Sequence, residues 1–184
     1  LTKEQLDTIN GGFKGAPKFP MPNTLDYLLR YQHHYNDPKL FKYIKTSLTK
    51  MAYGGIYDQI GGGFSRYSVD ERWHIPHFEK MLYDNAQLVS LYSIAYLQDK
   101  NELYKNVVQG TLRFVNEELS ANNGAFYSSL DADSKNENDE LEEGVFYSWT
   151  KEELQSLIKE YDLFSDYYNV NDFGFWEKDL YVLV

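Results

Sequence analysis

Histidine, aspartate and arginine side chains that could perform acid–base chemistry gather between residues 66 and 84. His74 and His77 lie three residues apart, and imidazole is the side chain whose ordinary pKa allows proton transfer near neutral pH. Asp84 follows them with a carboxyl group that could give or take a second proton. The sequence therefore predicts a proton-transfer site in which His74, His77 and Asp84 are the catalytic residues.

Side chains suited to binding a substrate occur in and around the same stretch. Aromatic rings offer flat faces and polar tips to a ring-shaped ligand, and the chain is 17% aromatic. Arginine and carboxylate groups hydrogen-bond to hydroxyl groups. The residues that we expect to bind substrate are Arg66, Tyr67, Trp73, Asp58, Asp131 and Asp133.

Each of these residues also has a structural interpretation. Glu79 could complement a helix dipole, Lys80 could pair with Asp84 four residues later, and both histidines could be packed polar groups. For Asp131 and Asp133, a pair of carboxylates near a sugar and a solvated hairpin tip remain open.

Two stretches imitate metal sites without meeting their requirements. The histidines of "HIPH" flank a proline and lack the glutamate and the helical spacing of zinc motifs. "DADSKNEND" resembles a calcium loop, but Lys135 takes a ligand position and the required glycine is missing. We therefore predict no metal and no cofactor.

Hydrophobic periodicity and end signals predict a mainly helical chain. Asp37 followed by Pro38 is typical of a helix start, and Asp99 is expected to cap the fourth helix. The capping box "TKEE" opens a later helix at Thr150. The predicted helices span about 23–35, 38–53, 76–97, 101–119 and 150–159, with a further helical turn at 164–168.

The third of these helices would carry the polar cluster at its first turns. A helix from Pro76 places His77, Lys80 and Asp84 on one side, next to free N–H groups and the positive end of the dipole. Its shaft from Ala86 to Leu97 is apolar nearly all round, which predicts burial.

A small β-hairpin is expected near 125–149, inserted between helices. The alternating stretches "NNGAFYSSLDADS" and "GVFYSW" predict its two strands, with the acidic loop 133–143 between them.

Composition limits the classes of function. The chain has 184 residues, 18 basic against 28 acidic side chains, and a net charge of −10, which disfavours binding to nucleic acid or anionic membranes. No apolar run is long enough for a membrane span, and the first residues lack a signal-peptide pattern. Because the chain has no cysteine, it offers no thiol chemistry. We expect a cytoplasmic protein.

Glycine and phenylalanine precede a polar connector and a helix at three places, so the chain resembles a repeat of helical hairpins. The stretches "GGFKGAPKFP", "GGIYDQIGGGFSRYSVDERWHIPHFEKMLYDNAQL" and "SSLDADS…EEGVFYSWTKEEL" resemble the family that includes bacterial YyaL and spermatogenesis-associated protein 20. That resemblance implies part of an (α/α)6 toroid, like N-acylglucosamine 2-epimerases and six-hairpin glycosidases. It also implies that residues 1–184 are a partial domain, truncated at both ends, whose thioredoxin-like partner domain is absent here.

Three functions remain open from the resemblance and the residues. The leading one is a sugar-processing or sugar-binding site with histidine-based proton transfer, as in an epimerase or isomerase, and with a saccharide as ligand. A second is a non-catalytic module that contacts the family's thioredoxin-like domain. A third is a glycoside hydrolase that uses the aspartate pair.

Overall fold

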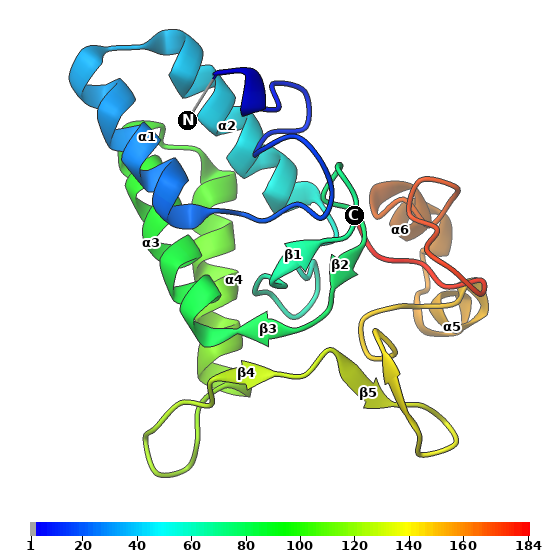
Figure 1. Cartoon of the computed structure of the whole chain (residues 1–184). Helices are drawn as coiled ribbons and strands as arrows, with labels where there is room; N and C mark the ends of the chain where they lie inside the picture. Colours follow the sequence, from blue (N-terminus) through cyan, green and yellow to red (C-terminus); the bar gives the residue numbers. More distant parts are fainter. Residues whose placement is uncertain (1–2) are drawn as a thin grey trace.

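Four helices in two hairpins form the main body of the molecule (Figure 1). The computed structural model describes residues 3–184. Helix α1 packs on both α2 and α3, and α4 packs on both α3 and α2. The four helices are α1 (Pro22–Tyr35), α2 (Pro38–Tyr53), α3 (Leu82–Gln98) and α4 (Glu102–Glu118); a 3₁₀ turn, η1 (Lys3–Gln5), precedes them.

Two side-chain caps fix where α2 and α4 begin. The Asp37 carboxylate accepts hydrogen bonds from two backbone N–H groups of the first turn, those of Lys39 at 3.1 Å and Leu40 at 3.0 Å, which confirms the predicted start of α2. The residue predicted to cap α4, Asp99, is not its cap. Asn101 caps α4, whereas Asp99 ends α3 and donates its backbone N–H to Ala95.

The predicted helix start at Pro76 is wrong, because the chain remains extended until α3 begins. Strand β1 (Tyr67–Ser68) pairs with β2 (Pro76–His77), and β3 (Lys80–Met81) pairs with β4 (Ser129–Leu130). Proline also disfavours helical backbone in the residue before it. Hydrogen bonding between distant segments therefore replaces the first turn and a half of the expected helix.

Burial alternates along this extended segment, residues 75–81. Phe78 and Lys80 are 1% exposed, whereas His77 and Glu79, at the alternate positions, are only half-buried. Successive side chains of a strand point to opposite faces. His77 and Lys80 consequently point to opposite faces, so Lys80 does not share a face with His77 and Asp84 as the helix prediction required.

Helix α3 is not buried all round, contrary to the prediction. Leu88, Leu91 and Tyr92 lie in the main core, but Tyr83 is 46% and Leu97 is 69% exposed. One apolar side of this helix thus faces outward in the described chain.

The small β-hairpin within 125–149 is confirmed, but its strands differ from those predicted. Strand β5 (Asp133–Lys135) pairs with β6 (Leu141–Glu143) across the acidic turn. The stretch "GVFYSW" forms a turn and a bridge of Trp149 to Tyr181 instead of a strand. The acidic loop itself therefore supplies both strands.

Two short helices, α5 (Lys151–Leu157) and α6 (Tyr161–Tyr167), pack with the end of the chain. The capping box at Thr150 is confirmed, since Thr150 and Glu153 exchange hydrogen bonds of 2.8 and 3.2 Å. This part has its own small core, made of Leu154, Val170, Tyr181 and Leu183.

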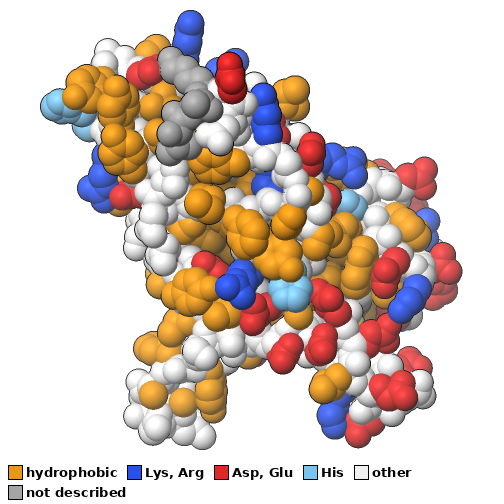
Figure 2. All heavy atoms as spheres, in the orientation of Figure 1, with side chains coloured by type: hydrophobic (Ala, Val, Ile, Leu, Met, Phe, Trp, Pro, Cys, Tyr) orange, Lys and Arg blue, Asp and Glu red, His pale blue; other side chains and the backbone are white. Residues whose placement is uncertain are grey.

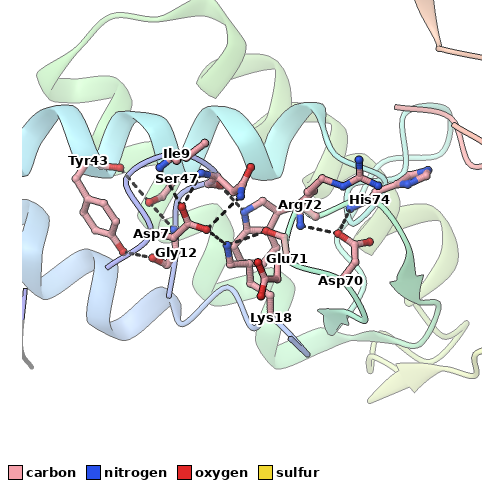
Figure 3. A network of polar contacts seen from close by, with 12 residues as sticks. Asp7, Ile9, Gly12, Lys18, Tyr43, Ser47, Asp70, Glu71, Arg72 and His74 are labelled. Carbon is pink, nitrogen blue, oxygen red and sulfur yellow. Dashed lines mark hydrogen bonds and ion pairs between the residues drawn. The ribbon is translucent and has the colours of Figure 1, made fainter. Parts of the chain in front are cut away.

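A polar network ties the segment before α1 to α2 and to the turn at 70–74 (Figure 3). The Lys18 ammonium, which is 1% exposed, lies 2.8 Å from Asp7 Oδ2 and donates to the carbonyl of Glu71, also at 2.8 Å. Gly12 donates to Ser47 Oγ, and a Cβ on Gly12 would lie 2.5 Å from the Trp73 ring. The turn that carries Trp73 and His74 is thereby held in place.

Candidate functional site

Polar and aromatic side chains gather where α1 and α3 begin, beside β1 and β2. We call this group the His77 surface; it consists of Phe19, Arg66, Tyr67, His77, Glu79, Asp84 and Glu143. Figure 2 shows basic, histidine and acidic side chains side by side next to an apolar patch on this face. Four of the residues predicted for the site, Arg66, Tyr67, His77 and Asp84, lie here.

His77 is held from two directions. Its Nδ1 lies 2.8 Å from Oε1 of Glu143, at the end of β6, and its ring stacks on Tyr67 with centroids 4.9 Å apart and planes 16° apart. Tyr67 in turn contacts Phe19 at 4.9 Å. A carboxylate beside Nδ1 favours the tautomer that carries its proton there, so the Nε2 lone pair is left to accept a proton.

Arg66 and Asp84 complete the polar part of the surface. Arg66 Nη1 lies 3.2 Å from Glu79 Oε2, and its backbone N–H donates to the carbonyl of the same residue at 2.9 Å. Asp84 is half-buried, and its Oδ2 has no hydrogen-bond partner among the described residues. Burial raises the pKa of Asp84 and Glu79 raises it further, against the opposing effect of Arg66. Asp84 thus adds a carboxyl group that takes up a proton more readily than an ordinary aspartate.

The structure does not bring His74 to this surface. His74 is 4% exposed and its ring stacks on Phe173 with centroids 5.7 Å apart. Its backbone N–H and that of Ile75 donate to the carboxylate of Asp70, which fixes the turn. Burial lowers the pKa of the imidazole, in spite of the nearby Asp70, so His74 is kept neutral.

Trp73 lies in the main core and not at a cavity mouth. Its side chain is fully buried, its Nε1 donates to the carbonyl of Asn10 at 2.8 Å, and the Lys18 ammonium lies 5.2 Å from the ring centroid. Its φ of 67° is unusual for a residue with a side chain. In this structure the indole has no free face on which a sugar could stack.

The three remaining predicted residues, Asp58, Asp131 and Asp133, line a cavity of about 1110 Å³ on the other side of the extended segment. We call it the Lys80 cavity. Lys80 Nζ lies 2.8 Å from Asp58 Oδ2 and donates to the carbonyl of Gly62 at 2.9 Å. The same ammonium also contacts the aromatic rings of Phe114 and Tyr147, and each ring centroid lies 4.6 Å from Nζ.

Burial governs the protonation of this cavity. Desolvation lowers the pKa of Lys80 despite the adjacent Asp58. The pKa of Tyr147 is raised to about 12, mainly by burial and further by Asp58 and Glu118. Lys80 makes two hydrogen bonds and contacts two aromatic rings, so this pair ties elements together more than it offers chemistry.

Glu143 was not predicted as a site residue. Lys80 was predicted on one side with His77 and Asp84, and it lies instead in the Lys80 cavity. Glu143 is separated from His77 by 66 residues and stands in an acidic run that was interpreted as a solvated tip. No local signal connects the two residues. For Lys80, the apolar residues at alternate positions, Pro76 and Phe78, were the available signal for an extended segment.

Neither a metal site nor a membrane span is found in residues 3–184. In that range no group of three or more histidine, aspartate or glutamate side chains could hold a metal ion. None of the helices described there has the length and apolar content needed to cross a membrane.

The fold is part of an α/α toroid similar to that of sugar epimerases. The cellobiose 2-epimerase of Spirochaeta thermophila superposes with a TM-score of 0.61 at 18% identity, covering 69% of this chain and 34% of that one. The cellobiose 2-epimerase of Bacillus thermoamylovorans gives 0.61 at 13% identity, with 76% and 41% covered. A D-mannose isomerase gives 0.52 at 20% identity, with 62% and 30% covered. These likenesses confirm the predicted helical toroid architecture and no more.

Sequence relatives identify the chain more closely. It is 44% identical over 162 residues to spermatogenesis-associated protein 20 of Homo sapiens, and 38% identical over 188 residues to an uncharacterized protein of Caenorhabditis elegans. The resemblance to the spermatogenesis-associated protein 20 family is thereby confirmed over 85% of the chain. The chain spans about a fifth of the human relative's length, 21%. No protein-family model matches it.

Proposed function

We propose that this chain supplies part of the site of a sugar epimerase or isomerase, with His77 as the group that transfers a proton. The observation that supports this most is the pair of His77 and Glu143, 2.8 Å apart, stacked against Tyr67 on the half-exposed His77 surface. The toroid fold shared with sugar epimerases points the same way.

The proposed chemistry is a proton transfer next to a carbonyl group. Neutral His77, whose Nδ1–H donates to Glu143, accepts at Nε2 the proton on the carbon beside the carbonyl of an open-chain sugar. The electron pair of that C–H bond moves into an enediolate, whose negative oxygen Arg66 can stabilise. Asp84, with its raised pKa, then delivers a proton to the opposite face or to the neighbouring carbon.

Other parts of the earlier hypotheses stay predictions. Asp131 and Asp133 are exposed, and the Asp131 carboxylate accepts a hydrogen bond from the backbone N–H of Asp133 at 3.1 Å. A turn of this kind fits a solvated hairpin tip as well as it fits the carboxylate pair of a glycoside hydrolase. The cytoplasmic location and the thioredoxin-like partner domain also remain predictions.

The full-length protein should be incubated in D₂O with a panel of aldoses, ketoses and disaccharides, and deuterium uptake at the carbon beside the carbonyl followed by NMR. We expect uptake with at least one sugar and a loss of about 10²-fold or more in His77→Gln. His34→Gln, at an exposed histidine of α1, is the matched control and should leave the rate unchanged.

If no sugar exchanges hydrogen while the protein is folded, the epimerase or isomerase proposal is wrong, and the non-catalytic module and the glycoside hydrolase remain. The same conclusion follows if His77→Gln and His34→Gln react at equal rates.

A further inference from the structure

A second cavity of about 640 Å³ lies away from the His77 surface, between the end of α2, the start of α4 and the segment after α6. We call it the His74 cavity. Its size is that of a site for a small organic molecule. The side chains that matter here are Lys50, Arg72, His74, Asn106, Tyr168 and Phe173.

His74 is one of the residues that line this cavity, and it carries a buried polar atom without a partner among the described residues. The residue is 4% exposed, and its Nε2 is buried without a hydrogen-bond partner among the described residues. Buried polar atoms are nearly always paired, and leaving one unpaired costs about 1–3 kcal/mol. Because burial also lowers the pKa of this imidazole, the ring stays neutral and has one nitrogen able to accept a hydrogen bond. A ligand hydroxyl group would satisfy it.

The charges around the cavity are of one sign. No aspartate or glutamate lines it, although the chain carries 28 acidic against 18 basic residues. Two cations line it, Lys50 near the end of α2 and Arg72 in the turn before His74. Such a lining repels cations and favours a negatively charged ligand.

Aromatic side chains give the cavity faces for a ring-shaped ligand. Phe173 stacks on His74 and has the Arg72 guanidinium 5.5 Å from its ring centroid, yet it is 49% exposed. Tyr168 and Asn106 add hydroxyl and amide groups. The wall therefore combines an apolar face, neutral hydrogen-bonding groups and a pair of cations.

We propose that the His74 cavity binds a small hydroxylated anion, the chemistry shared by sugar phosphates and sugar acids. The anionic group lies between Lys50 and Arg72, a hydroxyl group donates to His74 Nε2, and the carbon skeleton packs on Phe173. This site is separate from the His77 surface and does not depend on the function proposed for it.

Binding should be measured by calorimetry on the full-length protein with four probes: glucose 6-phosphate, gluconate, glucose and inorganic phosphate. We expect one or both of the anionic sugars to bind at least tenfold more tightly than glucose and than inorganic phosphate. Comparing glucose 6-phosphate with gluconate identifies whether phosphate or carboxylate is preferred.

Variants that remove the two cations test whether the ligand binds in the cavity. The double variant Lys50→Gln/Arg72→Gln should weaken binding of the anionic sugar at least tenfold. The control Lys39→Gln/Lys42→Gln removes the same charge from exposed positions of α2 and should change the affinity less than twofold, as should His77→Gln.

Three results with the anionic sugars and the variants would overturn the proposal. They are the absence of binding by both anionic sugars, equal loss of affinity in the two double variants, and loss of binding in His77→Gln. Tight binding of inorganic phosphate alone would also contradict it, because the hydroxyl groups would then contribute nothing.

Discussion

Two hydrogen-bonded side-chain pairs, Lys80–Asp58 and His77–Glu143, start from the same extended segment, residues 75–81, and end in different surroundings. Lys80 points inward to Asp58, with side chains 2% and 16% exposed. His77 points outward to Glu143, with side chains 31% and 46% exposed. Both pairs have a 2.8 Å contact.

The two pairs differ in which hydrogen-bonding groups of Lys80 and His77 remain available to a ligand. The Lys80 ammonium is occupied by a carboxylate, a carbonyl and two aromatic rings, and it is shut away from solvent. Glu143 engages one nitrogen of His77 and leaves the other to accept a proton. The comparison teaches that equal distances can mark a structural tie on one face of a strand and a chemically available group on the other.

The largest effect is expected from Lys80→Ala, which leaves Asp58 without its cation and empties the space between Phe114 and Tyr147. The local unfolding free energy around β3 and α4 should fall by about 3–5 kcal/mol. Urea-dependent hydrogen exchange of the full-length protein measures it. Lys105→Ala, which removes an exposed pair with Glu102, is the control and should lower the stability far less than Lys80→Ala does. Equal losses in both variants would remove the distinction between the pairs.

Glu143→Gln should reduce turnover at least about tenfold while the unfolding free energy changes by less than about 1 kcal/mol. The amide can no longer stabilise the imidazolium that forms when His77 accepts a proton. Glu142→Gln, next to it and paired with Lys178, is the matched control. A fall in stability without a selective fall in turnover would make Glu143 a structural residue only.

His74 predicts a pH effect of a definite sign. Its pKa is lowered in the folded protein, so the unfolded chain binds a proton first as the pH falls. Stability that is present above the ordinary histidine pKa of about 6.5 is lost as the pH falls toward the lowered value. The protein should therefore lose more stability between pH 8 and pH 5 than His74→Phe does. Thermal unfolding at several pH values tests this, with His33→Phe as an exposed control; parallel curves for the parent and His74→Phe would contradict it.

The smallest stability effect is expected from Arg66→Ala. The pair with Glu79 is exposed, with side chains 44% and 26% accessible, and solvent screening should leave it little effect on stability. Its removal should nevertheless raise the pKa of Asp84, because Arg66 now lowers it. NMR titration of the Asp84 carboxyl measures the shift. An unchanged Asp84 titration would show that Arg66 does not act on this carboxyl.

Helix boundaries could be predicted where the signal is local. Asp37 with Pro38 gave the start of α2, and Thr150 with Glu153 gave the start of α5, because a capping side chain acts within one turn. The start of α3 could not be predicted in this way. Pairing of Lys80–Met81 with Ser129–Leu130 joins segments that are distant in the sequence, and it overrides a helical pattern.

In the candidate site, too, the positions set by nearby residues could be predicted and those set by distant segments could not. Arg66, Tyr67, His77 and Asp84 were expected together and lie on one surface, because a short two-stranded turn and the next helix position them. Trp73 was expected there and lies in the core, since the segment before α1 covers it.

By itself, the sequence determined the helical hairpins, the caps at Asp37 and Thr150 and the stretch that carries the polar side chains, because these depend on periodicity and on contacts within a few residues. The tertiary structure decided which way each of those side chains points. It separated His74 from His77 through the turn at Asp70, and it brought Glu143 to His77 across 66 residues. Which groups meet depends on the pairing of distant strands, and no short stretch of sequence contains that information.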